Sequence, residues 1–288
     1  MMAHVAEAAE QRGRVVLRLS CTQPSRIAIE AAVRIAQAFH SEIESVFVAE
    51  PDVFDVAAFP FAREVSLTGR HTRQLSPEIM TRQMRQVAEA MTQRVAALAR
   101  LAEVPSRSTI VRDEPLRAMA QVCEACGPWN VIALADCVLP RSGDVIRQLF
   151  EHVVDTTGIV ITGPKARTTQ GAVIVVVEDA GHLEPMLRAA RRLVPPESGE
   201  RVQILLVADN VAQLGELEGQ VRLALGLDAD VDLLRAAPVH GSAHGVAEAL
   251  RRLRGGFVIG QFGGRLVPLT GDLGHLAATL ECPLLVVR

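Results

Sequence analysis

Short apolar runs alternate with amphipathic stretches along the whole chain. After the apolar run 15–19, apolar residues recur at spacings of three and four from Ile27 to Phe39, which predicts a strand followed by a helix that begins at Pro24. The same alternation continues to the end of the sequence. It predicts strands at 15–19, 43–48, 108–111, 131–135 and 159–162, and then at 173–177, 202–207, 231–234, 257–260 and 284–287. It predicts helices at 24–39, 76–102, 116–126, 144–154, 183–194, 211–225, 243–253 and 272–280.

The order of these elements occurs twice, which indicates an internal repeat. The ends of the first two strands, Leu19 and Val48, lie 29 positions apart, and the corresponding residues Val177 and Val207 lie 30 apart. The last two strands of each pass are separated by the same 24 positions. Almost the whole difference in length between the two passes therefore lies in the segment 49–105.

Alternating strands and helices are typical of parallel sheets that helices cover on both faces. The sequence therefore predicts an α/β fold of two tandem doubly wound parallel-sheet domains, 1–166 and 167–288, with the polar segment 164–170 as the linker. In such sheets a ligand binds beyond the carboxyl ends of the strands, where the strand order reverses. We expect any small-molecule site directly after the first and fourth strands of each domain.

Composition argues against several classes of function. The 288 residues are 49% apolar and carry a net charge of −3, so each domain can bury a core and the chain offers no basic surface for nucleic acid. No apolar run reaches the roughly 18 residues of a membrane span, and the N-terminus lacks the apolar core of a signal peptide. We therefore expect a cytoplasmic protein that binds neither nucleic acid nor membrane.

The five cysteines are odd in number and irregularly spaced, which predicts reduced thiols instead of a disulfide framework. Cys123 and Cys126 form a C-x-x-C, but they end a predicted helix, whereas redox pairs lie at a helix N-terminus that lowers the thiol pKa. We expect a structural role for this pair, with a metal or redox role as the alternative. A second cysteine pair that would complete a zinc site is absent from the sequence.

Three segments carry a family resemblance: LRLSCTQPSRIAIEAAVRIA (17–36), FVIGQFGG (257–264) and CPLLVVR (282–288). They resemble the universal stress protein family in its tandem, two-domain form, and the resemblance covers nearly the whole chain. It implies the adenine nucleotide alpha hydrolase-like fold. ATP-binding members of the family carry an aspartate at the end of the first strand and, after the fourth strand, G-x-x-G, nine residues and then G-S or G-T. The aspartate helps to hold the adenosine, and the glycines let backbone amides approach the phosphates.

The first half departs from this pattern at both motifs. Ser20 stands at the aspartate position, and Ala135-Asp136-Cys137-Val138 stands where the family has G-x-x-G. Side chains at these positions crowd a phosphate path, and Asp136 places a negative charge beside it. Ser142 and Gly143 alone do not restore a phosphate cradle. We expect no ATP site in this half.

The second half keeps more of the motif. Gly260-Gln261-Phe262-Gly263 is a G-x-x-G, nine residues separate Gly264 from Gly274, and Glu178 takes the aspartate position. The resemblance implies weak binding of an adenine nucleotide, ATP or AMP, at this edge. The alternative is that the glycines only form tight turns after a strand. The residues assigned to the nucleotide are Glu178, Gly241, Gly260, Gly263, Gly264, Gly271, Gly274 and His275.

Three histidines are expected near the same edge. His240 and His244 lie between the third strand and the following helix, and His275 lies after the fourth strand. Imidazoles bind metals and phosphates. Since no nearby carboxylate or thiol completes a recognised ligand set, we predict no metal.

The segment 49–105 holds a phenylalanine cluster. Phe54, Phe59 and Phe61 fall within eight positions, in a chain that has only eight phenylalanines. Three explanations are open: a lid over the core of its own domain, a contact between the two halves, or a surface for a partner or a second copy.

Recognised catalytic motifs are absent from the sequence. The single lysine, Lys165, is followed by alanine and cannot belong to a P-loop, and neither G-x-S-x-G nor H-E-x-x-H occurs. We therefore predict a non-catalytic stress-response or regulatory protein that resembles universal stress proteins. The alternatives are a protein-interaction module that has lost both nucleotide sites and a weak ATP hydrolase. We expect either a monomer whose halves pack as the dimers of this family do, or a homodimer.

Overall fold

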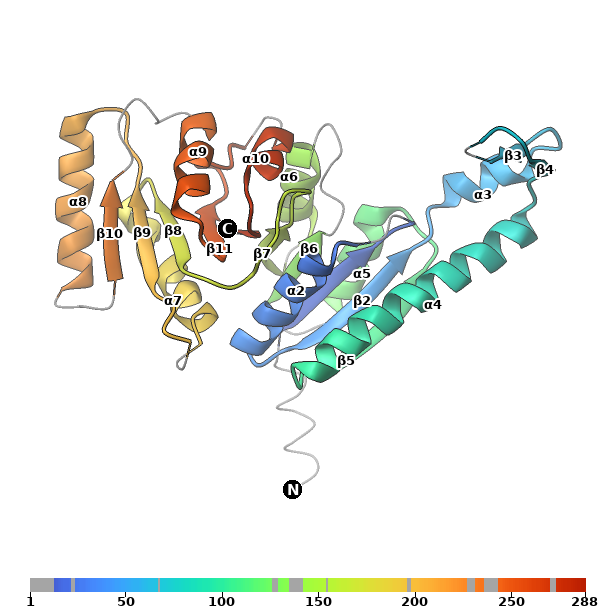
Figure 1. Cartoon of the computed structure of the whole chain (residues 1–288), viewed down its shortest axis with the longest axis horizontal. Helices are drawn as coiled ribbons and strands as arrows, with labels where there is room; N and C mark the ends of the chain where they lie inside the picture. The colour runs from blue at the N-terminus through green and yellow to red at the C-terminus, as the bar shows by residue number, and fades with distance from the viewer. Residues whose placement is uncertain are drawn as a thin grey trace, which may run out of the picture.

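The computed structural model describes residues 13–21, 24–66, 68–125, 129–134, 142–153, 155–195, 198–226, 231–235, 243–269 and 273–288. Within these residues a large ten-stranded sheet runs through the whole molecule, and a small two-stranded sheet lies apart from it (Figure 1). The strands of the large sheet are β1 (Arg14–Leu19), β2 (Glu42–Val48), β5 (Ser106–Val111), β6 (Asn130–Leu134), β7 (Thr156–Ile161), β8 (Val173–Val177), β9 (Val202–Leu206), β10 (Val231–Arg235), β11 (Phe257–Gln261) and β12 (Leu284–Val287).

The helices lie where the sequence periodicity predicts them, with ends that differ by a few residues. They are α2 (Arg26–Ala38), α4 (Pro77–Leu101), α5 (Pro115–Glu124), α6 (Ser142–His152), α7 (Leu183–Leu193), α8 (Val211–Leu225), α9 (Ala243–Leu253) and α10 (Gly274–Thr279), with a 3-10 turn, η1 (Ala180–His182), before α7. Side-chain caps mark the N-terminal ends of three of these helices. Ser25, Ser76 and Asn210 each accept a hydrogen bond from the backbone amide three residues later, which satisfies one of the unpaired donors of a helix N-terminus.

The sheet has the order β10-β9-β8-β11-β12-β7-β6-β1-β2-β5. Within the large sheet, the N-terminal strands β1, β2, β5, β6 and β7 and the C-terminal strands β8 to β12 each follow the order 3-2-1-4-5, and the pairs within each set are parallel. This confirms the predicted doubly wound α/β fold. The domain boundary at 166/167 falls between β7 and β8 and stays a prediction.

One pairing was not predicted. The fifth strands of the two halves, β7 and β12, lie antiparallel, with Ile161 opposite Leu284 and Gly158 opposite Val287. This pairing joins the two parallel sets into one continuous sheet. The halves are therefore related across β7 and β12 much as two subunits of a dimer are across a shared strand pair.

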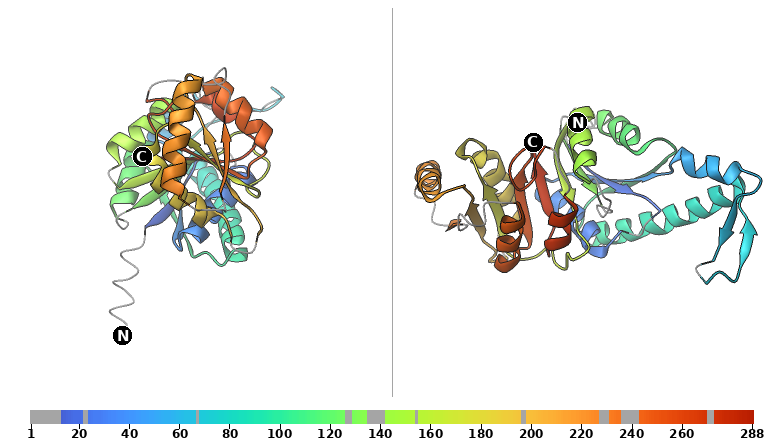
Figure 2. Two further views of the ribbon diagram at one scale, coloured as in Figure 1. Left: turned by 90° about the vertical axis from the view of Figure 1, so that its left-hand side faces the viewer. Right: turned by 90° about the horizontal axis from the view of Figure 1, so that it is seen from above.

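Helices cover both faces of the sheet, so the core consists of two apolar layers (Figure 2). One layer packs α2, α4, α7 and α8 against side chains such as Val15, Leu17 and Val175. The other packs α5, α6, α9 and α10 against side chains such as Val16 and Val258. Successive residues of a strand point to opposite faces, which explains why neighbouring valines belong to different layers.

The segment 49–105 contains a projecting arm that the sequence predicted only in part. Between β2 and α4 it contains α3 (Pro51–Ala58) and a hairpin of β3 (Arg63–Val65) and β4 (Thr72–Gln74). Figure 1 shows α3 and this hairpin at the N-terminal end of α4, at the end of the molecule away from the C-terminal half. The explanation that the phenylalanine cluster joins the two halves is therefore wrong. We call α3, β3, β4 and the first half of α4 the arm.

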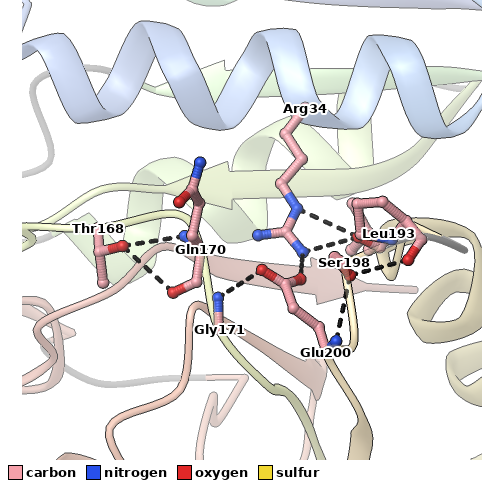
Figure 3. A network of polar contacts seen from close by, with 8 residues as sticks. Arg34, Thr168, Gln170, Gly171, Leu193, Ser198 and Glu200 are labelled. Carbon is pink, nitrogen blue, oxygen red and sulfur yellow. Dashed lines mark hydrogen bonds and ion pairs between the residues drawn. The ribbon is translucent and has the colours of Figure 1, made fainter.

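A polar network adds to the contact between the halves (Figure 3). Arg34 of α2 donates hydrogen bonds to the carbonyl oxygen of Leu193 at 2.7 and 3.1 Å and to the Glu200 carboxylate at 2.5 Å. The other oxygen of Glu200 accepts a hydrogen bond from the amide of Gly171 at 2.7 Å. The side chains of Arg34 and Glu200 are each only 12% exposed, so this ion pair is largely shielded from water. In the other apolar layer, Phe262 contacts Phe150 of the N-terminal half, with 4.7 Å between the ring centroids and the rings tilted by 36°.

Candidate functional site

The carboxyl edge of the C-terminal half gathers charged side chains where the strand order reverses. Glu178 directly follows β8, and the loop 262–269 follows β11, the strand that neighbours β8 on the other side of the reversal. Asp209 lies three residues after β9, the other neighbour of β8. This edge is the place where a doubly wound sheet binds ligands, and it contains the residue that the sequence assigned to the family aspartate position.

Glu178 closes onto the loop after β11. Its Oε2 accepts a hydrogen bond from the backbone amide of Arg265 at 2.6 Å, and its Oε1 accepts one from the amide of Leu266 at 3.0 Å. The carboxylate is 15% exposed, and hydrogen bonds from amides to an ionised acceptor are stronger than those to a neutral one. We call this pair of hydrogen bonds the Glu178 latch. It means that two loop amides are already bound to an anion that belongs to the chain.

The three neighbouring glycines have structural roles that are now visible. Gly263 has a φ of +86°, in the left-handed region that favours glycine, and its amide donates to the carbonyl oxygen of Val267 at 2.8 Å, which closes a tight turn. A Cβ on Gly264 would lie 3.0 Å from Oε1 of Glu178, so a side chain there would push the Glu178 carboxylate away from the loop amides. Gly260 is buried in β11, where a Cβ would lie 3.0 Å from Leu266.

An ion pair spans the same edge. Arg265 binds both carboxylate oxygens of Asp209, with 2.6 Å between Nη2 and Oδ2. The hydrogen bond from Arg265 lowers the pKa of Asp209 below its usual range, and the same bond raises the pKa of Arg265. The sequence analysis missed both residues. The sequence did contain a clue to them, because each is a charged residue a few positions after the end of a strand, at the edge where a site was expected.

Only some of the predicted site residues lie close together in the structure. Glu178, Gly263 and Gly264 come together at the latch, and Gly260 lies in the adjacent strand. Gly274 and His275 begin α10. Gly241 and Gly271 lie outside the described residues, and the nucleotide contacts assigned to all these positions stay predictions.

The predicted gathering of histidines is only partly within the described chain. His244 is exposed on α9, and His240 lies outside the described residues. Across the part of the chain that the structure describes, His, Cys, Asp and Glu side chains form no group of three or more that could hold a metal ion.

The corresponding edge of the N-terminal half is an apolar groove. It has a volume of about 530 Å³ and lies between the end of β1 and one side of α4. Its lining residues are Cys21, Met80, Gln83, Met84, Gln86, Val87, Ala90, Met91 and Arg94. The segment 135–138, where the family has its glycines, lies outside the described residues. The first strand of this half therefore ends beside methionine side chains, whereas β8 ends at a carboxylate.

The described cysteines differ in exposure. Cys123 is buried in the last turn of α5, which fits the structural role expected of it, and Cys126 lies outside the described residues. Burial raises the pKa of the Cys282 thiol to about 12. Cys21, at the groove, is exposed.

Of the helices described, not one combines the length and the apolar character that a membrane-spanning segment needs.

Comparison with known proteins gives similarity in structure alone. No family model and no curated protein sequence matches the chain. A universal stress protein from Archaeoglobus fulgidus DSM 4304 is similar with a TM-score of 0.58 and 14% identity, over 96% of this chain and 97% of that one. A protein of unknown function from Pseudomonas aeruginosa PAO1 has a TM-score of 0.55 and 12% identity, over 98% and 94%. The cytoplasmic domain of a prokaryotic cation chloride cotransporter has a TM-score of 0.54 and 11% identity, over 96% and 95%.

These likenesses extend over nearly the full length of each chain, so the fold is that of the universal stress proteins. Identities of 11 to 14% show the fold alone, and one fold serves many functions.

Proposed function

We propose that this universal-stress-protein-like chain is a non-catalytic regulatory protein whose C-terminal site binds an adenine nucleotide, ATP or AMP, only when the nucleotide displaces the Glu178 latch. The observation that carries the proposal is the pair of hydrogen bonds from the amides of Arg265 and Leu266 to the Glu178 carboxylate. An anion already bound to these donors makes the loop an anion site, and the same anion competes with any phosphate that enters. Binding is therefore weak in the wild-type chain.

The neighbouring residues supply what a phosphate requires once the latch opens. Gly263 and Gly264 leave the loop free of side chains, so a phosphate oxygen can approach the amides. The guanidinium of Arg265 can exchange the carboxylate of Asp209 for a phosphate, which it binds in the same two-point geometry. The carboxylates of Glu178 and Asp209 act here as hydrogen-bond acceptors, and binding without turnover is the expected outcome.

The test is calorimetric titration of nucleotide-stripped protein with ATP and with AMP. The Glu178→Gln variant keeps the size of the side chain and removes its charge, so we expect it to bind at least about tenfold more tightly than the wild type, because each charge-assisted hydrogen bond contributes about 1.5–3 kcal/mol. Glu184→Gln is the matched control, since this carboxylate is exposed on α7 and outside the site. Wild-type binding that Glu178→Gln leaves unchanged would contradict the latch.

If neither the wild type nor Glu178→Gln gave heat at millimolar nucleotide, the nucleotide would have to be removed from the proposal. The second candidate, a protein-interaction module without a nucleotide site, would then take its place. It is favoured by the exposed phenylalanines of the arm, Phe59 and Phe61. Release of ADP from bound ATP would instead favour the weak hydrolase.

A further inference from the structure

A cavity of about 490 Å³ lies where the two halves of the chain meet. Its volume falls in the range typical of small-molecule sites, which is about 300–1,000 Å³. The N-terminal half contributes residues at the end of α2 and at the start of β6 and β7, and the C-terminal half contributes residues of α7 and β12. The cavity shares no residue with the Glu178 latch. We call it the junction cavity.

A missing side chain in the sheet makes the floor of the junction cavity. On β7, Gly158 lies opposite Val131 of β6 on one side and opposite Val287 of β12 on the other. A Cβ on Gly158 would lie 3.1 Å from Leu285 and 3.8 Å from Val131, so it would point to the same face of the sheet as these two side chains. Because glycine has no side chain, a hollow is left between its neighbours. The floor is apolar and includes the strand pair that joins the halves.

One side of α7 and two aromatic rings complete the lining. Pro185, Ala189 and Arg192 follow one another on α7 at spacings of four and three, so they lie on one side of the helix. The rings of Phe39 and Trp129 contact each other, with centroids 5.6 Å apart and planes tilted by 55°. Both side chains are half-buried. Aromatic rings prefer tilted or offset contacts, so this pair can accept a third ring beside it.

Positive charge dominates the polar part of the lining. The guanidinium of Arg192 lies over the Phe39 ring, 5.3 Å from its centroid, and Arg288 lies at the same cavity. Within the part of the chain that the structure describes, neither arginine forms an ion pair. Among the described lining residues Asp155 is the only acid. A guanidinium without an ion pair can bind a carboxylate through two parallel hydrogen bonds, so this lining favours an anion.

We infer that the junction cavity binds a small aromatic carboxylate, whose ring packs beside Phe39 and Trp129 over the apolar floor and whose carboxylate pairs with Arg192. The volume accommodates one or two rings. Because both halves line the cavity, a bound ligand stabilises the junction between them. This site is independent of the nucleotide proposed for the edge at Glu178, so each proposal can fail without the other.

The chain contains its own reporter for this cavity. Trp129 is the only tryptophan, and the sequence has no tyrosine. The test is titration of the full chain with phenylacetate while tryptophan emission is recorded, with excitation at a wavelength where phenylacetate is transparent. We expect a saturable change with a dissociation constant on the order of millimolar or below, because a ligand of about ten non-hydrogen atoms offers few contacts.

Two matched ligands separate the charge from the ring. Phenylacetamide keeps the ring and lacks the charge, and it should bind at least about tenfold more weakly because it loses the charge-assisted hydrogen bonds. Cyclohexylacetate keeps the charge and lacks the aromatic ring, and it should bind at least about threefold more weakly. Equal binding of phenylacetamide would overturn the carboxylate contact, and equal binding of cyclohexylacetate would overturn the aromatic one.

Two variants locate the binding. Arg192→Gln should weaken phenylacetate binding at least about tenfold, and Ala189→Phe, which fills the cavity from α7, should abolish it. Both should keep the circular dichroism spectrum of the wild type, since these side chains are at least partly exposed. Arg188→Gln is the matched control, because Arg188 lies one turn earlier on α7, pairs with Glu184 and is not a lining residue.

Two results would overturn the inference as a whole. One is a wild-type emission that shows no saturable change up to about 10 mM phenylacetate, a concentration that exceeds the expected dissociation constant. The other is saturable binding that Arg192→Gln leaves unchanged, because the ligand would then lie elsewhere on the chain.

Discussion

The two halves share one strand order and differ at the edge where that order creates a site. In the C-terminal half a carboxylate follows β8 and binds the amides of the loop after β11. In the N-terminal half Ser20 follows β1, and a groove lined by methionines opens beside it. The difference shows that the fold fixes where a site lies, whereas a few side chains after the strands decide what kind of site it is.

The inserted arm explains much of this difference. The C-terminal half has α8 where the N-terminal half has α3, the hairpin and the 25-residue helix α4. The extra length carries α4 beyond the end of β1, so that Met80 and Met84 line the edge of the sheet. In the C-terminal half the same edge is open to charged side chains, and the ion pair of Arg265 with Asp209 lies across it. Four changes test this comparison.

The largest effect is expected for the ion pair that joins the halves. Arg34→Ala leaves the Glu200 carboxylate largely buried without its cation, which should lower the free energy of unfolding by about 3 kcal/mol or more. Urea unfolding followed by circular dichroism measures the change. Arg188→Ala removes an exposed ion pair and should cost less than about 1 kcal/mol. If the two variants lost the same stability, the halves would not depend on this contact.

The next effect separates the two edges directly. Glu178→Ala leaves the amides of Arg265 and Leu266 without their acceptor and should cost about 2–3 kcal/mol, since hydrogen bonds to a charged group contribute about 1.5–3 kcal/mol each and water replaces part of the loss. Ser20→Ala, at the corresponding position, should cost less than about 1 kcal/mol because it removes a neutral hydroxyl. Equal losses in urea unfolding would mean that the edges do not differ as described.

A smaller effect is expected where a side chain is added to the loop. A Cβ at Gly264 would lie 3.0 to 3.2 Å from the carboxylate atoms of Glu178, so Gly264→Ala should cost about 1–2 kcal/mol by forcing them apart. In a Glu178→Ala background the same change should cost much less. The coupling energy of this double-mutant cycle is the measurement, and a value near zero would show that Gly264 does not serve the latch.

The smallest effect concerns pH. The pKa of Asp209 is lowered by its hydrogen bond from Arg265, so this bond contributes stability above the ordinary carboxyl pKa of about 3.9 and loses it as the pH falls through the lowered value. Asp209→Asn should therefore be less stable than the wild type at neutral pH, and the difference should disappear in strong acid. Urea midpoints of both proteins, measured from neutral pH down to about pH 2, below the lowered pKa range, test this. A stability difference between the two proteins that grew as the pH fell would contradict this prediction.

The fold was predictable because its signals are local in the sequence. Apolar runs such as 173–177 and the period of α2 give strands and helices directly, and their alternation gives a parallel sheet. The antiparallel β7–β12 pairing was not predictable, because an apolar strand has the same pattern in either orientation. The hairpin β3–β4 was missed because its strands have three residues each and are exposed on both sides, which leaves no alternation to detect.

The site was predictable only where one residue could be aligned with a motif. Glu178, Gly263 and Gly264 were found through the family resemblance, but their mutual contact was not, since 86 positions separate Glu178 from Gly264. Arg265 and Asp209 match no motif, and they meet only because parallel strands bring their carboxyl ends to one edge. Of the open explanations for the phenylalanine cluster, the structure leaves a core contact for Phe54 and an outward surface for Phe59 and Phe61.

The antiparallel pairing of β7 with β12 also bears on how the chain could be divided. Each of these strands covers an edge that would otherwise present unpaired backbone donors and acceptors to solvent, and open edges of this kind promote aggregation. Either half produced alone would therefore precipitate or pair with its own copies through that edge. Produced together, fragments 1–166 and 167–288 would find the complementary edge in each other, so the protein is suited to reconstitution from two separate polypeptides.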